Sequence, residues 1–276
     1  MEYVKYTKIK PNKILIGEDE HKYTDKLPDT VFYETGPNID PVLENNEWSV
    51  IKQVCQSGQA ANYWALGDEK IIAVTESGTT YQVPHAIVDM TANRYDYTSD
   101  NTKKTQVVFQ SVPMLLYEVF NSSSNVSPNG DTAYNGWGYS ELRTKMNSGS
   151  VYNAYDSSFT ALLEQVNTKC AYSGLTNELT ASADKLFLPA SKEAFSNPSY
   201  TQSCESSLTE FGFYAQNSDA DANRIKLRID DNQAHVWWLR SPLAGHGGLV
   251  LNVYGGGSLS SDVAYGSRGV APCFAW

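Results

Sequence analysis

The C-terminal stretch WWLRSPLAGHGGLVLNVYGGGSLSSDVAYGSRGVAPCFAW runs from Trp237 to Trp276 and joins two unlike kinds of sequence. Bulky apolar blocks stand at its ends, WWL at 237–239 and VAPCFAW at 270–276. Between them, residues 243–267 are small or adaptable and include no Lys, Glu, Gln, Met or Trp. The two blocks predict core strands, and the segment between them predicts a loop-rich surface that carries the function.

The overall composition argues against two classes of partner. The chain has 276 residues, enough for one large domain or two small ones with a sizeable core. Charged residues make up 19% and aromatic residues 12%, so the surface is suited to hydrogen bonds and ring contacts. The net charge is −10 and no basic stripe is present, which disfavours nucleic acid and anionic membranes.

The N-terminus and the cysteines bear on the cellular compartment. The opening MEYVKYTKIK lacks the apolar segment of a secretory signal, and no run is long enough to span a membrane. We therefore expect assembly in the cytoplasm or release without a signal. The cysteines form no CxxC pair, which predicts buried or incidental thiols and leaves a disulfide open; they are Cys55, Cys170, Cys204 and Cys273.

Residues 1–45 differ from the rest of the chain. A short hairpin is predicted around the acidic turn at 18–20, and three prolines then punctuate an extended segment. This region has too few apolar residues for a core of its own. We expect an N-terminal arm for attachment or linkage, or alternatively an added edge strand, followed by one domain at 46–276.

The pattern in that domain predicts an α+β fold. We expect strands at 70–75, 83–90, 105–112, 184–189 and 225–229, with two or three more in the final stretch. We expect helices at 48–55 with Ser49 as the N-cap, at 140–146 and at 157–170, and a helical turn at 191–195. Short strands, few helices and long loops are typical of the α+β class.

No motif predicts catalysis or metal binding. The four histidines lack metal-ligand spacing, so solvated or core positions are favoured for each. Asp219 with Asp221, or Asp230 with Asp231, could hold a cation, but the other residues of a calcium loop are missing. Gly255–Gly257 is typical of a turn rather than a phosphate loop. We predict no catalytic residue, no metal and no cofactor.

The final stretch predicts a hairpin on a buried base. Residues 249–254 alternate in polarity, and 258–265 return after a turn at Gly257. Tyr, Ser, Gly and Asn are favoured in antibody loops, although a purely structural hairpin would have the same composition. At least one of Trp237 and Trp238 is expected in the core, with a sugar-stacking platform as the alternative. Arg240 is expected to make a structural pair or a loop hydrogen bond rather than contact a ligand.

Several blocks carry a resemblance to a known group. They are AANYWALGD at 60–68, GWGYSELRTKM at 136–146, KLFLPASKEAF at 185–195, WWLRSP at 237–242 and GVAPCFAW at 269–276. The chain resembles the variable proteins of diversity-generating retroelements, and more closely a domain family of Firmicutes and their phages. Over roughly 46–276 the resemblance implies a C-type-lectin-like fold of the formylglycine-generating-enzyme variety.

The resemblance also implies a variable region at 237–276. In that group, adenine-directed mutagenesis rewrites codons into many residues but never into Lys, Glu, Gln, Met or Trp, the five absent from 243–268. The expected scaffold positions are Asn252, Val253, Gly257 and Ala264. One departure is Ala271, where many relatives carry Arg. The expected ligand-binding positions are Leu243, His246, Gly248, Tyr254, Ser258, Ser260, Ser261, Asp262, Tyr265, Gly266 and Arg268.

The function expected from this resemblance is ligand binding at the tip of a phage tail fibre or baseplate. The partners would be a glycan or protein on the host surface and, through the arm, other virion proteins; a homotrimer would suit a fibre. The protein would be assembled in the bacterial cytoplasm, with the cytoplasm or cell surface as alternative locations. The alternative functions are a structural virion protein and a copper-dependent oxidase, for which Cys273 alone lies near the expected site.

Overall fold

The computed structural model describes the backbone and side chains at 39–122, 136–216 and 221–276, apart from the Leu116 side chain. Within 1–38 it describes only four strands: β1 Tyr3–Tyr6, β2 Leu15–Ile16, β3 Asp19–Glu20 and β4 Val31–Glu34. The chain forms two compact units, Met1–Ile39 and Asp40–Trp276. In the first unit β1 pairs with β4, and β2 pairs with β3 as the predicted hairpin, both antiparallel.

The second unit begins six residues earlier than the predicted boundary at 45/46. Leu43 is 2% exposed, so the segment after Ile39 already contributes to the core. The Asn46 side chain accepts a hydrogen bond from the Asp40 N–H (2.9 Å). The Trp64 indole N–H donates to the Asp40 carbonyl (3.2 Å). These contacts join 40–45 to the larger unit, and the predicted boundary was wrong by that segment.

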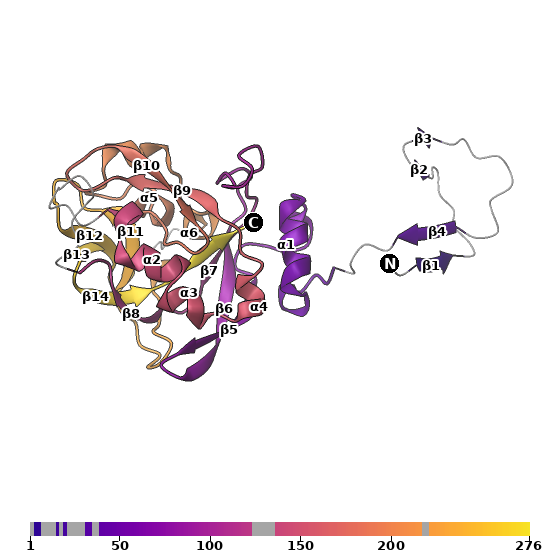
Figure 1. Ribbon diagram of the computed structural model, residues 1–276, viewed down its shortest axis with the longest axis horizontal. Coiled ribbons are helices and arrows are strands. Elements are labelled where there is room, and N and C mark those ends of the chain that lie inside the picture. The colour runs from indigo at the N-terminus through magenta and orange to yellow at the C-terminus, as the bar shows by residue number, and fades with distance from the viewer. Residues whose placement is uncertain are drawn as a thin grey trace. The chain divides into compact units, whose positions relative to one another are not determined.

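The larger unit mixes strands and short helices, which confirms the α+β class (Figure 1). Its helices are short, and α2 packs beside α3 and β8. They are α1 Trp48–Gln56, α2 Glu141–Asn147, α3 Ser150–Ala154, α4 Ser157–Thr160, α5 Ser191–Ala194 and α6 Gly212–Ala215. Short 3-10 turns lie at Leu43–Asn45, Ala60–Asn62, Trp137–Tyr139, Ser203–Ser207 and Ala222–Arg224.

The described residues of this unit form three sheets. Their orders are β13-β12-β11-β14-β8, β15-β7-β6-β5 and β10-β9. The strands are β5 Glu69–Glu76, β6 Thr79–Asp89, β7 Val108–Ser111, β8 Leu115–Val119, β9 Val166–Ala171, β10 Leu179–Asp184, β11 Trp237–Pro242, β12 Leu249–Val253, β13 Leu259–Val263, β14 Ser267–Val270 and β15 Cys273–Ala275. The final stretch therefore supplies five strands rather than two or three.

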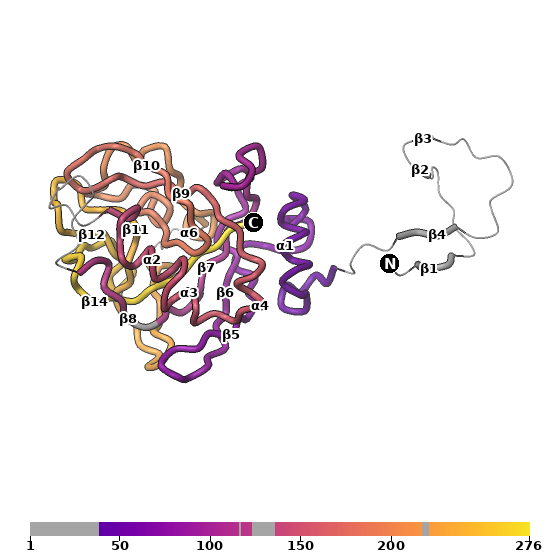
Figure 2. The backbone as a smooth tube through the Cα atoms, viewed as in Figure 1, coloured from indigo at the N-terminus to yellow at the C-terminus, as the bar shows by residue number. Residues whose placement is uncertain are grey.

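Strand β11 is the centre of the five-stranded sheet. It pairs antiparallel with β12 and, through Trp237 and Gly269, parallel with β14. All six of its residues are buried. The chain then leaves this sheet after Val270, and β15 joins the other sheet beside β7, as the C-terminal trace in Figure 2 shows. The WWLRSP block thus forms the predicted core strand.

The terminal block completes an aromatic core. The ring of Phe274 stacks on that of Phe109 with centroids 5.0 Å apart. Trp48 from α1 contacts Phe109, Phe274 and Trp276 edge-on at 5.6–5.8 Å. Aromatic side chains bury large areas and prefer such edge-on or offset geometries. Every residue from Gly269 to Trp276 is buried, as predicted.

Two of the predicted helices are present. Helix α2 is capped by Ser140, whose side chain accepts from the Arg143 N–H (3.0 Å), satisfying one free donor of the first turn. Helix α1 buries Ile51, Val54 and Cys55 on one face. Its N-cap is Glu47 without a side-chain bond, so the prediction of Ser49 was wrong.

The predicted helix at 157–170 was wrong over most of its length. Only α4, Ser157–Thr160, is helical, and β9 begins at Val166. In β9, Val166, Thr168 and Cys170 are buried while Asn167 and Lys169 are more exposed, the period of a strand. Antiparallel pairing with all six residues of β10 decides the conformation of this segment.

Two predicted strands reduce to isolated bridges. At 184–189 the strand ends with Asp184, and Phe187 bridges to Cys273. At 225–229, Leu227 bridges to Ala234 and Arg228 to Met114. Strands 70–75, 83–90 and 105–112 correspond to β5, β6 and β7. None of the helices in the described parts of the chain has the length and apolarity needed to span a bilayer.

Candidate functional site

A cleft of about 510 Å³ follows the edge strand β13. This volume lies within the range of small-molecule sites, roughly 300–1,000 Å³. One wall comes from the β11–β13 region. The other comes from the loop after α5 and from Asp221, which precedes the 3-10 turn at Ala222–Arg224. The lining residues are Phe195, Asn197, Pro198, Ser199, Tyr200, Asp221, Leu243, Leu251, Ser258, Leu259, Ser260 and Ser261.

Four of the predicted ligand-binding residues meet in this cleft: Leu243, Ser258, Ser260 and Ser261. Leu243 is only 7% exposed, so it forms part of the base of the cleft. Ser261 pairs with Leu251 across β12 and β13, which puts both side chains on one face of the sheet. All five residues of β13 are half-buried, as expected for an edge strand with one neighbour.

The predicted scaffold residues lie beneath this surface. Asn252 is 2% exposed, and Val253 and Ala264 are fully buried. Gly257 is buried with φ +91°, a conformation that L side chains rarely adopt. A Cβ at Gly257 would lie 1.8 Å from the Asp221 carbonyl oxygen. The hairpin turn therefore packs directly against the opposite rim of the cleft.

Tyr254 and Tyr265, the expected aromatic anchors, are both exposed but lie at opposite ends of the β12–β13 hairpin. Tyr254 precedes the turn at Gly257, whereas Tyr265 follows the far end of β13. The four steps from Leu259 to Val263 span roughly 14 Å of strand. The two rings therefore do not converge on one spot. His246, Gly248 and Gly266 lie at the same end as Tyr265.

Asp262 and Arg268 are bound to each other. The guanidinium of Arg268 forms an ion pair with the Asp262 carboxylate, and the two side chains are 32% and 28% exposed. The other carboxylate oxygen accepts from the Val263 N–H (2.7 Å). This pair closes the connection between β13 and β14, so both residues contribute to the turn.

Sequence reasoning missed the second wall of the cleft. Tyr200 is 73% exposed and has φ +62°, a left-handed conformation that is uncommon for a large side chain. Its carbonyl accepts from the Ala244 N–H (2.8 Å), which joins the two walls. The available signal was the long polar segment that begins at Tyr200, because long loops within a compact domain are often functional.

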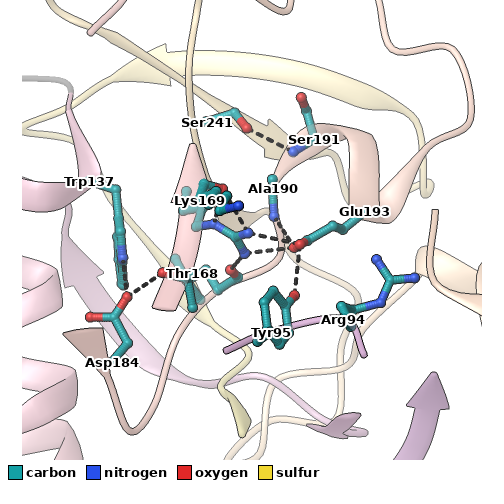
Figure 3. Close-up of polar contacts among 12 residues, drawn as sticks. Arg94, Tyr95, Trp137, Thr168, Lys169, Asp184, Ala190, Ser191, Glu193 and Ser241 are labelled. Atoms are coloured by element: carbon teal, nitrogen blue, oxygen red, sulfur yellow. Dashed lines mark hydrogen bonds and ion pairs between the residues drawn. The ribbon is translucent and has the colours of Figure 1, made fainter. Parts of the chain in front are cut away.

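A buried ionic network holds β11 through Arg240 (Figure 3). The Arg240 guanidinium donates to both carboxylate oxygens of Glu193, at 2.6 and 2.8 Å. The Tyr95 hydroxyl (2.7 Å) and the Ala190 N–H (2.9 Å) donate to the same carboxylate, and Figure 3 shows them converging on it. Burial, and then the negative charge of Glu193, raise the pKa of Tyr95. The predicted structural pair of Arg240 is confirmed.

A second buried carboxylate connects β11 to the loop wall. Ser241 donates to Glu205 (2.6 Å), and its hydroxyl accepts from the Ser191 N–H (2.8 Å). The Ser191 hydroxyl contacts Thr201 (2.7 Å), the residue after Tyr200. Burial raises the pKa of Glu205, and the hydrogen bonds from Ser241 and the Ala171 N–H oppose this shift. These contacts hold the loop against the strand.

The tryptophans of β11 and the four cysteines have structural rather than functional environments. Trp237 and Trp238 are both fully buried, which confirms the core prediction and removes the stacking platform. The four cysteines are free thiols. Burial raises the pKa of Cys273, the opposite of what a nucleophilic thiolate needs.

The acidic pairs also differ from a cation site. Asp230 and Asp231 both contact Arg228, and Asp231 also contacts His235. Asp219 lies outside the described residues. Within 39–122, 136–216 and 221–276, no group of three or more His, Cys, Asp or Glu is arranged to hold a metal ion.

Residues 110–275 match a family described as a domain of unknown function, DUF6273. The chain belongs to this family. The match begins within β7 and includes every residue that lines the cleft. No curated protein and no solved structure matches the chain.

Proposed function

We propose that this DUF6273 protein is a ligand-binding module with a C-type-lectin-like fold and a diversified surface, carried at the tip of a phage tail fibre or baseplate. The observation that carries the proposal is the meeting of Leu243, Ser258, Ser260 and Ser261 in one cleft. The family resemblance implied these positions as variable, independently of any pocket.

The arrangement suits a tunable receptor site. Ser258, Ser260 and Ser261 lie on or next to an edge strand, whereas the expected scaffold residues Asn252, Val253, Gly257 and Ala264 are buried. Side chains at an edge can change without opening the core, since surface substitutions usually alter stability by less than about 0.5 kcal/mol. The N-terminal unit Met1–Ile39 would attach the module to other virion proteins.

Binding to bacterial cells tests the receptor function. Labelled full-length protein is measured on a panel of bacterial strains, together with the double variant Ser260→Arg/Ser261→Arg, which adds two long charged side chains to the strand that lines the cleft. We expect binding to fall at least tenfold, whereas Thr79→Arg on the exposed β5–β6 hairpin leaves binding unchanged. Equal binding by all three proteins would count against the cleft as the receptor site.

Sequencing the gene in a propagated population tests diversification. We expect substitutions at the eleven predicted positions and none at Asn252, Val253, Gly257 or Ala264. A reverse transcriptase and a near-duplicate repeat should lie beside the gene. Variation spread evenly over scaffold and surface positions would contradict the mechanism while leaving the binding function intact.

A further inference from the structure

The cleft has two classes of lining residue. Leu243, Leu251 and Ser258–Ser261 belong to the stretch 237–276, where variation is proposed. The other lining residues lie outside that stretch: Phe195, Asn197, Pro198, Ser199, Tyr200 and Asp221. A ligand in the cleft would therefore touch a constant wall and a variable wall at once.

The constant wall presents an exposed aromatic ring on a backbone that is held in place. Tyr200 is the most exposed of the large apolar or aromatic side chains in the described regions, at 73%. Its left-handed backbone is held by the Ala244 N–H on the Tyr200 carbonyl and by the adjacent Thr201–Ser191 contact. A strained backbone conformation persists only where several surrounding contacts hold it, and such residues cluster at ligand sites.

The polar groups of the cleft are suited to hydroxyl groups. Asn197 and Ser199 on the constant wall, with the serines of the variable wall, both donate and accept hydrogen bonds. Asp221 adds an exposed carboxylate that accepts only. Among the described residues that line the cleft, none is Lys, Arg or His. A phosphate, sulfate or carboxylate would find no counter-charge on these walls.

We propose that the cleft binds an uncharged saccharide, with Tyr200 as the stacking platform and Asp221 as a hydroxyl acceptor. This inference rests on the proposed binding function and adds the ligand class and the constant anchor. The face of an aromatic ring is electron-rich and attracts the C–H groups of a sugar ring. Tyr200 then supplies affinity common to all variants, while positions 258, 260 and 261 select among sugars.

The test is an array of defined neutral oligosaccharides, their sulfated and uronic acid counterparts, and linear peptides. Full-length protein is displayed on a multivalent support, because effective concentration raises weak single-site affinity. We expect wild-type protein to bind one or more neutral saccharides. Tyr200→Ala should weaken that binding at least tenfold, and Tyr200→Trp should keep it within about threefold. Asp221→Asn should weaken binding less than Tyr200→Ala does.

The matched control is Tyr63→Ala, because Tyr63 is also exposed, at 40%, and does not line the cleft. It should leave saccharide binding unchanged, and all variants should retain the wild-type thermal midpoint within a few degrees. Binding only to acidic saccharides, only to peptides or to no probe would overturn the inference, as would full binding by Tyr200→Ala.

Failure of the inference and failure of the proposed function are distinguishable. Cell binding that is lost in Ser260→Arg/Ser261→Arg without binding to any neutral saccharide keeps the function and refutes the saccharide. Cell binding that is insensitive to both the Ser260/Ser261 and Tyr200 variants refutes the function of the cleft itself.

Discussion

Strands β11 and β13 lie in one sheet, separated only by β12, yet they have opposite environments. In β11 every residue is buried, and Arg240 is neutralised by Glu193. In β13 every residue is half-buried, and among the described strands β13 pairs only with β12. The comparison shows how one short stretch of chain can contain both a rigid base and an adaptable surface.

The largest expected effect on stability comes from breaking the buried ion pair of β11. Arg240→Ala leaves the Glu193 carboxylate uncompensated at 0% exposure, which should lower the free energy of unfolding by about 3–5 kcal/mol. Urea unfolding measures the loss. The matched control is Arg268→Ala, which breaks the partly exposed pair with Asp262 of β13 and should cost at most about 1 kcal/mol. Equal losses would erase the distinction between the two strands.

The next effect concerns the turn that joins β12 to β13. Gly257→Ala forces a Cβ against the Asp221 carbonyl in a left-handed conformation, so we expect a loss of about 2–4 kcal/mol and weaker ligand binding. Gly256→Ala is the control, because no atom lies within 4 Å of its Cβ position. Thermal unfolding and cell binding measure the two effects. Equal results for Gly257→Ala and Gly256→Ala would refute the close approach of Gly257 to the Asp221 carbonyl.

Unlike β13, the fully buried core should be sensitive to acid through His85, which lies on β6 in the four-stranded sheet. Burial lowers the pKa of His85 to about 3 from its ordinary value of 6.5, so the unfolded chain binds this proton first. Stability from this group is complete above pH 6.5 and is lost as the pH falls toward 3, at up to about 1.4 kcal/mol per pH unit. His85→Gln should flatten this slope in denaturation measured from pH 6.5 to 3.5. If His85→Gln retained the full dependence of the unfolding free energy on pH, the burial argument would be contradicted. His246→Gln, at an exposed turn, is the control and should leave this dependence unchanged.

The smallest effect on stability is expected on β13. Ser260→Ala/Ser261→Ala should change the free energy of unfolding by less than about 0.5 kcal/mol, since neither side chain is fully buried. The same variant should alter which strains or saccharides bind. A loss of several kcal/mol would show that β13 belongs to the structural base.

Much of the fold could be predicted where local pattern and tertiary role agree. Helix α1, strands β5 to β7 and the buried WWLRSP strand follow from apolar spacing and β-branched residues. The segment 157–170 could not be predicted in this way. Phe159, Leu162, Leu163 and Val166 also fit helical spacing, and pairing with β10 decides between the two conformations.

The sequence by itself determined which segments are bulky and apolar and which consist of small residues, because side-chain size and polarity can be read from each residue alone. The sequence also shows that Lys, Glu, Gln, Met and Trp are absent from 243–267. Only the tertiary structure decided that β13 is an edge strand, that Tyr254 and Tyr265 lie apart, and that Tyr200 forms the facing wall. The physical reason is that neighbours in space depend on long-range contacts, such as Ser191 with Ser241, which no local pattern specifies.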